Sequence, residues 1–462
     1  MSETKQNIEN LFRNTPTDWN VVGVTSDTSN YFMAVAGTFG NTGWFKVHQF
    51  DVDGRLVRYG NWINAVGVET YETLFGVKFK YEGGITRDPG YVPSGPPREN
   101  PSGSGPTPPP PYNPNLDTIT SDYSSFDGYG EVDVRSAIEY VTGDTLAEQP
   151  EVQNDFGQNM YGLDRIGAPE AWAAGYTGEG VVIAVIDSGI DTDHPELDDN
   201  LWVNTDEIAG NGIDDDGNGY IDDRHGFNFR DGNANIEDSD FHGTHVSGTI
   251  AGEVGGLVQG VAYNAKLMTL KVFGPDGSAT TADLAEAIYY AVANGADIIN
   301  MSLGIRAREE EVDRSIWANI RTAMQFANDN GVITVAAAGN DRFDAPAVPG
   351  SYAVEAGIVV GAIDNTGNLD TGYSNRAGGA KDYLGDGAEV PLYVSAAGTA
   401  IWSTFPQDGV QQLPSENPDG YATIQGTSMA TPHVAAAIAL LLEADPTLTP
   451  DQIRVALANT TK

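Results

Sequence analysis

The stretch Val181-Val-Ile-Ala-Val-Ile-Asp187 is an uninterrupted apolar run that ends on a carboxylate. A short run of this kind is typical of a strand that is buried on both faces of a parallel sheet. Asp187 then stands at the carboxyl end of the strand, where open parallel sheets place their functional sites. The stretch therefore predicts both a class of fold and the position of a functional residue.

Candidate strands and helices alternate along the chain after Asp187. The patterns at 282–294 and 316–330 predict helices, the first with Thr280 and Asp283 placed as a capping box. Further short apolar runs predict buried strands at 266–273, 297–301, 332–337 and 357–362. Alternation of this kind is typical of an α/β fold with a largely parallel sheet.

Two glycine-rich segments complete a set of three reactive residues. They are Phe241-His242-Gly-Thr-His-Val-Ser-Gly248 and Gly426-Thr-Ser428-Met-Ala-Thr-Pro432. Serine attacks carbonyls poorly unless a base takes its proton and a carboxylate orients that base. The order Asp187, His242, Ser428 is one of the chain orders known for such a triad. Taken singly, the three residues would be a strand-end turn residue, a structural histidine and a helix N-cap; together they favour nucleophilic catalysis.

The sequence after Ser428 predicts a helix. Pro432 is followed by the apolar run 434–442, and this pattern indicates a helix that begins near Ser428. A serine at a helix N-terminus has backbone N–H groups and a favourable dipole close to its developing oxyanion.

These segments resemble the motifs of the subtilases, the subtilisin-like serine endopeptidases of peptidase family S8. The resemblance covers about 161–461 and includes Asp297-Ile-Ile-Asn-Met-Ser-Leu-Gly304 and Val335-Ala-Ala-Ala-Gly-Asn340. It implies a three-layer, subtilisin-like α/β fold with a mostly parallel central sheet.

The resemblance also implies a role for each reactive residue. Asp187 would orient His242, which would act first as general base and then as general acid. Ser428 would be the nucleophile, and Asn340 would donate to the oxyanion hole. The predicted activity is that of a serine endopeptidase (EC 3.4.21.-) acting on polypeptide substrates.

The substrate is expected to lie as an extended strand in a cleft lined by small residues. By family analogy Ser302, Leu303 and Gly304 would bind its backbone, and Ala337 and Gly339 would border the first specificity pocket. Two other classes stay open: a catalytically silent peptide-binding relative, and a structural calcium-binding relative.

The composition is strongly acidic. Of 462 residues, 65 are acidic and 24 are basic, which gives a formal charge of −41 and a pI near 4.1. This charge argues against nucleic acid or an anionic membrane as a partner. It is compatible with a salt-rich environment, with bound Ca²⁺ or with a merely solvated acidic surface.

Localisation stays open on the sequence alone. There is no cysteine, so disulfides are excluded together with any redox clue to the compartment. The first residues lack an apolar signal region, and no run approaches about 18 apolar residues, so no membrane span is expected. An intracellular protein and a protein whose signal was removed are both consistent with this.

An acidic segment between Asp187 and His242 predicts a calcium site. In Asn211-Gly-Ile-Asp-Asp-Asp-Gly-Asn-Gly-Tyr-Ile-Asp-Asp223, oxygen-bearing side chains alternate as in the first half of an EF-hand loop. His225 stands where the closing glutamate of that loop would be. The alternative is a solvated acidic turn. The predicted ligands are Asp214, Asp216, Asn218, the backbone carbonyl of Tyr220, and Asp222 or Asp223 for closure.

The chain divides into four predicted parts. Residues 1–86 predict a small β-rich domain that is either a pro-region, and thus a partner of the enzyme, or an accessory module. Residues 87–115 are a Pro/Gly-rich linker. Residues 116–150 either complete the catalytic fold or belong to a pro-region, and 151–462 form the catalytic domain.

The third part carries a displaced motif. The segment Asp127-Gly-Tyr-Gly-Glu-Val-Asp-Val134 resembles one that, in subtilases, usually follows the helix predicted here at 450–458. We therefore hypothesise a permuted arrangement in which residues of about 116–145 complete the fold from the N-terminal side. This requires the segment to pack against the helix at 450–458.

Overall fold

The computed structural model describes two compact units, Met1–Ser94 and Gly95–Lys462, which are treated separately. In the first unit it describes the backbone of five strands. In the second it describes residues 116, 118–152, 160–274, 276–304, 319–351, 357–378, 391–407 and 420–462, and the backbone of 314–318 and 352.

The first unit contains an antiparallel sheet. Its strands are β1 (Trp19–Ser26), β2 (Asn30–Phe39), β3 (Thr42–Asp51), β4 (Leu56–Arg58) and β5 (Trp62–Ile63). The order is β1-β2-β3-β4, with β5 paired to β3. The linker 87–115 lies outside the described residues, and the role of residues 1–86 stays a prediction.

The second unit is built on a seven-stranded sheet with the order β12-β11-β10-β9-β6-β8-β7. Every neighbouring pair in this sheet is parallel, which confirms the predicted α/β class. The strands are β6 (Val182–Asp187), β7 (Gly226–Asn228), β8 (Lys266–Lys271), β9 (Ile298–Met301), β10 (Ile333–Ala337), β11 (Gly357–Ile363) and β12 (Leu392–Ala397).

The opening apolar run forms the middle of this sheet as β6. Its side chains alternate between two cores, with Ile183 and Val185 in one and Ala184 and Ile186 in the other. All four are at most 1% exposed. Because both faces are covered, the strand is apolar at every position instead of at every second one.

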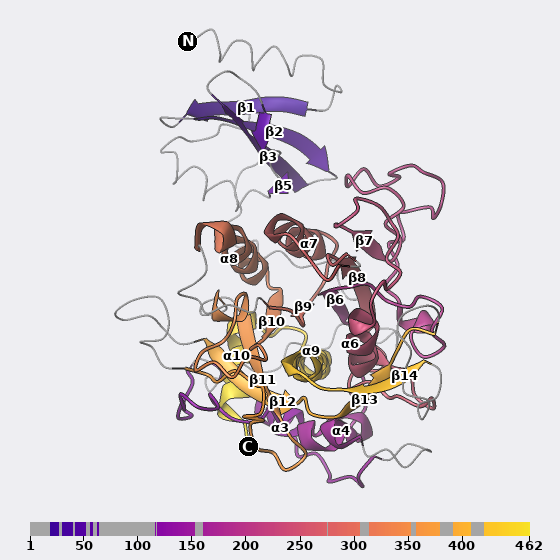
Figure 1. Ribbon diagram of the computed structural model, residues 1–462, viewed down its shortest axis with the longest axis vertical. Helices are drawn as coiled ribbons and strands as arrows, with labels where there is room; N and C mark the ends of the chain where they lie inside the picture. The colour runs from indigo at the N-terminus through magenta and orange to yellow at the C-terminus, as the bar shows by residue number, and fades with distance from the viewer. Residues whose placement is uncertain are drawn as a thin grey trace. The chain divides into compact units, whose positions relative to one another are not determined.

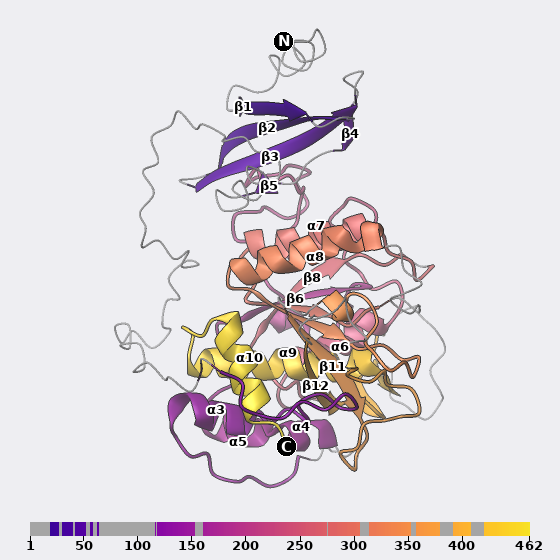
Figure 2. The same ribbon diagram turned by 90° about the vertical axis from the view of Figure 1, so that its left-hand side faces the viewer.

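Helices cover both faces of the sheet and complete the three layers (Figures 1 and 2). On one face lie α7 (Thr281–Ala293) and α8 (Arg314–Asp329), and on the other lie α6 (His242–Ala251) and α9 (Thr427–Ala444). The remaining elements are α3 (Val134–Thr142), α4 (Tyr161–Ile166), α5 (Ala168–Ala173), α10 (Pro450–Asn459), the 3₁₀ helices η3 (Asp198–Asn200) and η5 (Gly350–Tyr352), and the antiparallel pair β13 (Ile401–Thr404) and β14 (Tyr421–Ile424).

The predicted helices form close to their expected bounds. The Thr280 side chain accepts from the backbone N–H of Asp283 at 3.1 Å and so caps α7, which ends just before Gly295 in a left-handed conformation (φ 77°). Helix α9 begins one residue before Ser428, as predicted.

Helix α9 is also long and apolar enough to cross a membrane by length and composition, although 83% of it is buried inside the fold. It contacts β9, β10, β11 and β12. It is apolar all round because protein surrounds it, as expected for the central helix of a core.

Residues 118–152 pack into the second unit (Figure 2). Tyr129 and Val132 donate backbone hydrogen bonds to Tyr393 and Ser395 of β12 at 2.9 and 3.0 Å. The backbone N–H of Lys462 donates to the carbonyl of Glu131 at 2.9 Å. Helix α3 packs against α9 and α10, which is the contact that the permutation hypothesis requires.

Candidate active site

The sheet order brings the predicted site to one edge. After β6 the chain adds β7 and β8 on one side, with β8 next to β6, and then adds β9 on the other side, so the connections diverge at the carboxyl end of β6. A reversal of this kind opens a crevice at the carboxyl ends of parallel strands. Asp187 ends β6, Ser302 follows β9, and Asn340 follows β10.

Asp187 and His242 are hydrogen-bonded. His242 Nδ1 lies 2.8 Å from Asp187 Oδ1, the Asp187 side chain is 1% exposed, and the His242 side chain is 26% exposed. His242 is the first residue of α6, and Gly243 lets this helix approach β6 closely. A Cβ at Gly243 would lie 2.1 Å from the carbonyl oxygen of Gly189.

The charges around His242 favour its protonated form. Burial alone would lower the pKa of His242, because it disfavours the imidazolium. The charge of Asp187 and its hydrogen bond act the other way, as do the charges of Asp238 and Asp240. The net effect raises the pKa of His242 above its usual 6.5.

Ser428 lies in the first turn of α9, where a proline gives its backbone an unusual partner. Pro432 stands four residues later and has no N–H, so the carbonyl of Ser428 lacks its helical donor. Ser302 Oγ donates to this carbonyl instead, at 2.8 Å. Ser302 is 2% exposed, so its hydroxyl holds the turn that carries Ser428.

Asn340 is oriented by the residue before the serine. Its Oδ1 accepts from the backbone N–H of Thr427 at 2.9 Å and from Thr427 Oγ1 at 3.0 Å. This fixes Oδ1 as the acceptor, so Nδ2 is the donating atom on the other side of the amide. A Cβ at Gly426 would lie 3.4 Å from that nitrogen, which places it beside the turn of Ser428.

The structure thus brings the Asp187 carboxylate together with the His242 imidazole. Separately, it brings the Asn340 amide together with the turn that carries Ser428. Helices α6 and α9, which carry His242 and Ser428, pack against each other. Among the described side chains, no hydrogen bond joins His242 to Ser428. Catalytic hydrogen bonds are often long in free enzymes and tighten in the substrate complex.

The predicted substrate-binding residues differ in exposure. Gly304 is exposed and Leu303 half-buried, whereas Ala337 is buried inside β10. Ala347, which was not predicted, lies next to two members of this set. A Cβ at Gly304 would lie 3.6 Å from Ala347 Cβ, and one at Gly339 would lie 3.0 Å from it. Ala347 therefore stands between Gly304, which is predicted to bind the substrate backbone, and Gly339, which is predicted to border the first specificity pocket. Its sequence context carried no signal for this.

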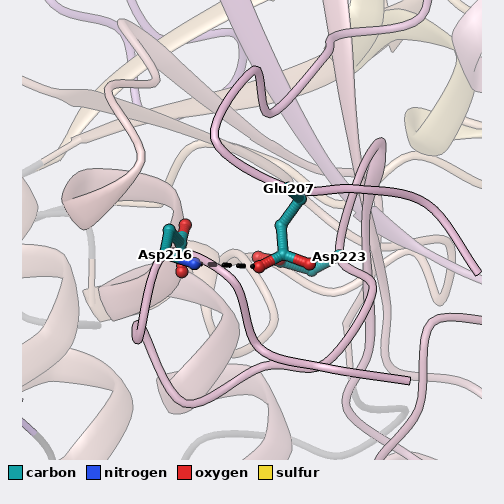
Figure 3. A group of neighbouring side chains, drawn as sticks. All are labelled: Glu207, Asp216 and Asp223. Carbon is teal, nitrogen blue, oxygen red and sulfur yellow. Dashed lines mark hydrogen bonds between the residues drawn. The ribbon is translucent and has the colours of Figure 1, made fainter. Parts of the chain in front are cut away.

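The acidic segment forms a compact carboxylate cluster, which we call the acidic cluster: Glu207, Asp216 and Asp223 (Figure 3). One oxygen of each lies within 4.8 Å of the others. Glu207 is 1% exposed and Asp223 is fully buried. Glu207 was not predicted, because it lies outside the alternating pattern.

The other predicted ligands differ in how they relate to the acidic cluster: Asn218 contacts it, whereas Asp222 bonds elsewhere. Asn218 Nδ2 donates to Asp216 at 3.0 Å and to Asp223 at 2.9 Å. Asp222 instead accepts from the backbone N–H of Asn211 at 3.0 Å. The Tyr220 side chain packs against Phe227, Phe229 and Tyr290, and Asp214 Oδ2 accepts from the N–H of Gly219 at 2.9 Å.

The acidic cluster has the donor set of a calcium site. Glu207 Oε2 and Asp214 Oδ1 are buried and have no hydrogen-bond partner within the described part of the chain. No lysine or arginine of that part forms an ion pair with Glu207, Asp216 or Asp223. Burial raises the pKa of Asp223, because it disfavours the ionised carboxylate. Hard carboxylate and amide oxygens are the ligands that Ca²⁺ prefers, so the residues fit this ion.

The comparisons with known proteins agree with this geometry. The model of the subtilase family matches residues 178–462. An alkaline protease of Alkalihalobacillus alcalophilus is 34% identical over 316 residues, which is 68% of either chain. The chain belongs to the subtilase family.

Other relatives of this subtilase carry related names. Subtilisin Savinase of Lederbergia lenta is 34% identical over 301 residues, 65% of this chain and 90% of the other. The solved structure of a cold-adapted subtilisin-like serine proteinase is 28% identical and covers 61% of this chain and 81% of its own, with a TM-score of 0.44.

Proposed function

We propose that this subtilase is a serine endopeptidase that hydrolyses polypeptides through an acyl-enzyme on Ser428. The observation that carries the proposal is the 2.8 Å hydrogen bond between Asp187 and His242, at the sheet edge that also holds Ser302 and Asn340. All of these residues lie within the range that matches the family.

The proposed reaction has two halves. His242 takes the proton of Ser428 as the hydroxyl attacks the scissile carbonyl, and Asp187 stabilises the imidazolium that forms. Asn340 Nδ2 and the backbone N–H of Ser428 donate to the oxyanion. His242 then returns its proton to the leaving amine, and water releases the acyl group by the same steps in reverse.

The test is chemical labelling followed by substitution. A fluorophosphonate should label the intact protein on Ser428 and abolish hydrolysis of a denatured protein substrate. Ser428→Ala should lower kcat by roughly 10⁶-fold, the magnitude known for loss of the nucleophile in subtilisin itself. A folded, calcium-loaded protein that is neither labelled nor active would instead favour the silent peptide-binding relative.

We also propose that Ca²⁺ stabilises this enzyme at the acidic cluster. Glu207, Asp216 and Asp223 would hold the ion, with Asp214 and Asn218 as nearby donors. The bound charge would offset the repulsion between the carboxylates and fix the segment 204–225 to the fold. Tyr290 of α7 donates to Asp223 at 2.5 Å, so the site is connected to a core helix.

Calcium removal tests this proposal in the Ser428→Ala protein, which cannot digest itself. A chelator should lower Tm by roughly 5–15 °C, because ion binding stabilises the folded state alone. Glu207→Gln should abolish most of that difference. The matched change Asp222→Asn should preserve it, because this carboxylate lies outside the acidic cluster. An equal fall in Tm on chelation in the Ser428→Ala protein and in its Glu207→Gln and Asp222→Asn variants would contradict the site.

A further inference from the structure

Asn375 is a fully buried residue that contacts the segment around the oxyanion donor. Its Oδ1 accepts from the backbone N–H groups of Asp341 and Phe343, both at 3.0 Å. Its Nδ2 donates to the backbone carbonyl of Ala338 at 2.9 Å. These partners stand before and after Asn340, so a single amide brackets that residue on both sides.

The three hydrogen bonds of the Asn375 side chain require an amide and not a carboxylate. An asparagine side chain offers an acceptor and a donor on one planar group, whereas an ionised aspartate only accepts. Aspartate at position 375 could keep the bonds from Asp341 and Phe343. Its second oxygen would then face the carbonyl of Ala338, which is also an acceptor.

Backbone contacts bring Asn375 close to the segment. Its N–H donates to the carbonyl of Gly339 at 2.9 Å, and the N–H of Arg342 donates to the carbonyl of Tyr373 at 3.0 Å. A Cβ at Gly339 would lie 2.6 Å from Asn375 Nδ2, and φ at this glycine is +102°. Only glycine permits this approach without displacing the amide.

The sheet holds Asn375 from the other side. The hydroxyl of Tyr393, a fully buried residue of β12, donates to the carbonyl of Asn375 at 2.6 Å. Ser374 Oγ donates to the same carbonyl at 3.1 Å. The backbone of Asn375 is therefore fixed to the central sheet, and the segment around Asn340 is fixed to the Asn375 side chain.

We propose that Asn375 is a positioning residue that acts through Asn340. It touches no substrate. It holds the backbone on both sides of Asn340 while Thr427 holds the Asn340 oxygen, so that Nδ2 faces the position where the substrate carbonyl becomes an oxyanion as Ser428 attacks it. The inference rests on the proposed peptidase function. An oxyanion donor acts only when it is aimed at that position within a few tenths of an ångström.

A double-mutant cycle on the full chain tests this. Asn375→Asp should lower kcat by about tenfold and change KM by less than about threefold, because the oxyanion exists only in the transition state. In the Asn340→Ala background, the same change should lower kcat by less than about threefold, because the donor it positions is gone.

Asn200→Asp is the matched control. Asn200 is also buried, and its Nδ2 donates to the backbone carbonyls of Ala251 and Tyr263 at 2.9 and 2.8 Å, away from Asn340. This change should lower Tm and leave kcat of the folded enzyme unchanged. If Asn375→Asp is not recovered folded, Asn375→Ala removes the whole side-chain amide without adding charge and carries the same expectation.

The outcomes separate the inference from the function on which it rests. An equal loss of kcat in both backgrounds, or no loss in either, would overturn the positioning role and leave the peptidase function intact. An unsubstituted enzyme without Ser428-dependent hydrolysis would overturn the peptidase function itself.

Discussion

At the scale of single residues, the carboxylates near His242 set the pH range in which it could act as the proposed general base. Only the neutral imidazole accepts the proton of Ser428, so kcat/KM rises as pH increases through the pKa of His242. Asp187, Asp238 and Asp240 hold that pKa above 6.5. Asp240 stands two residues before His242, where its charge can be removed without touching the Asp187 hydrogen bond.

Asp240→Asn should therefore move the acid limb of activity to lower pH. The imidazolium loses one stabilising charge, its pKa falls, and the base becomes neutral earlier, by about half a pH unit. The profile of kcat/KM between about pH 5 and 9 measures this. Asp451→Asn, which removes an equal charge from α10, should leave the limb in place. A shift to higher pH for Asp240→Asn would contradict the electrostatic argument.

At the scale of elements, the first turn of helix α9 depends on a hydrogen bond from a residue at the end of a strand. Pro432 removes the helical donor to the Ser428 carbonyl, and Ser302 replaces it from the end of β9. The turn that carries the proposed nucleophile is thus coupled to the segment predicted to bind substrate. Because the replacement is a side chain, one substitution can remove it.

Ser302→Ala should lower the free energy of unfolding by about 1–2 kcal/mol, since it leaves a partly buried carbonyl without a donor. The loss should be at most half as large in the Pro432→Ala background, where the N–H of residue 432 can again bond to Ser428. Urea unfolding of both pairs in the Ser428→Ala protein measures the coupling. Equal losses in the two backgrounds would show that Pro432 is unrelated to the bond.

At the scale of the whole molecule, residues 118–152 contribute to the core of the catalytic unit. Val132, Val134, Ala137 and Ile138 are fully buried in the cluster that also contains α9 and α10. Burial of each large aliphatic side chain stabilises a fold by roughly 1.5–3 kcal/mol. We therefore retain the permuted arrangement as a proposal. We expect removal of this segment to destabilise the catalytic unit.

Deletion of residues 1–94 should leave Tm of the Ser428→Ala catalytic unit within a few degrees, because the boundary between the two compact units lies there. Deletion of residues 1–152 should lower Tm by more than about 10 °C or prevent folding, since core side chains are lost. Thermal melts in excess Ca²⁺ compare the two proteins. An unchanged Tm after the longer deletion would show that the segment is dispensable.

Contiguous patterns in the sequence are enough to predict the class of fold, the strand that ends on Asp187, and the residues proposed for catalysis. Each of these has its signal in residues that are adjacent in sequence, either the apolar run of a doubly buried strand or a glycine-rich motif. Two of the predicted calcium ligands, Asp216 and Asp223, lie in the acidic cluster. Asp216 belongs to the alternating pattern of the segment, whereas Asp223 was one of two candidates for closing the site.

Partners that come from distant segments depend on the tertiary structure. Glu207, Ala347 and Asn375 have no local pattern, because the roles proposed for them depend on which segments the fold brings next to them. The same holds for Ser302, whose hydroxyl contacts the carbonyl of Ser428 across 126 positions of sequence. Local periodicity reports which face of an element is buried, whereas the identity of the group across that face is fixed only when the elements pack.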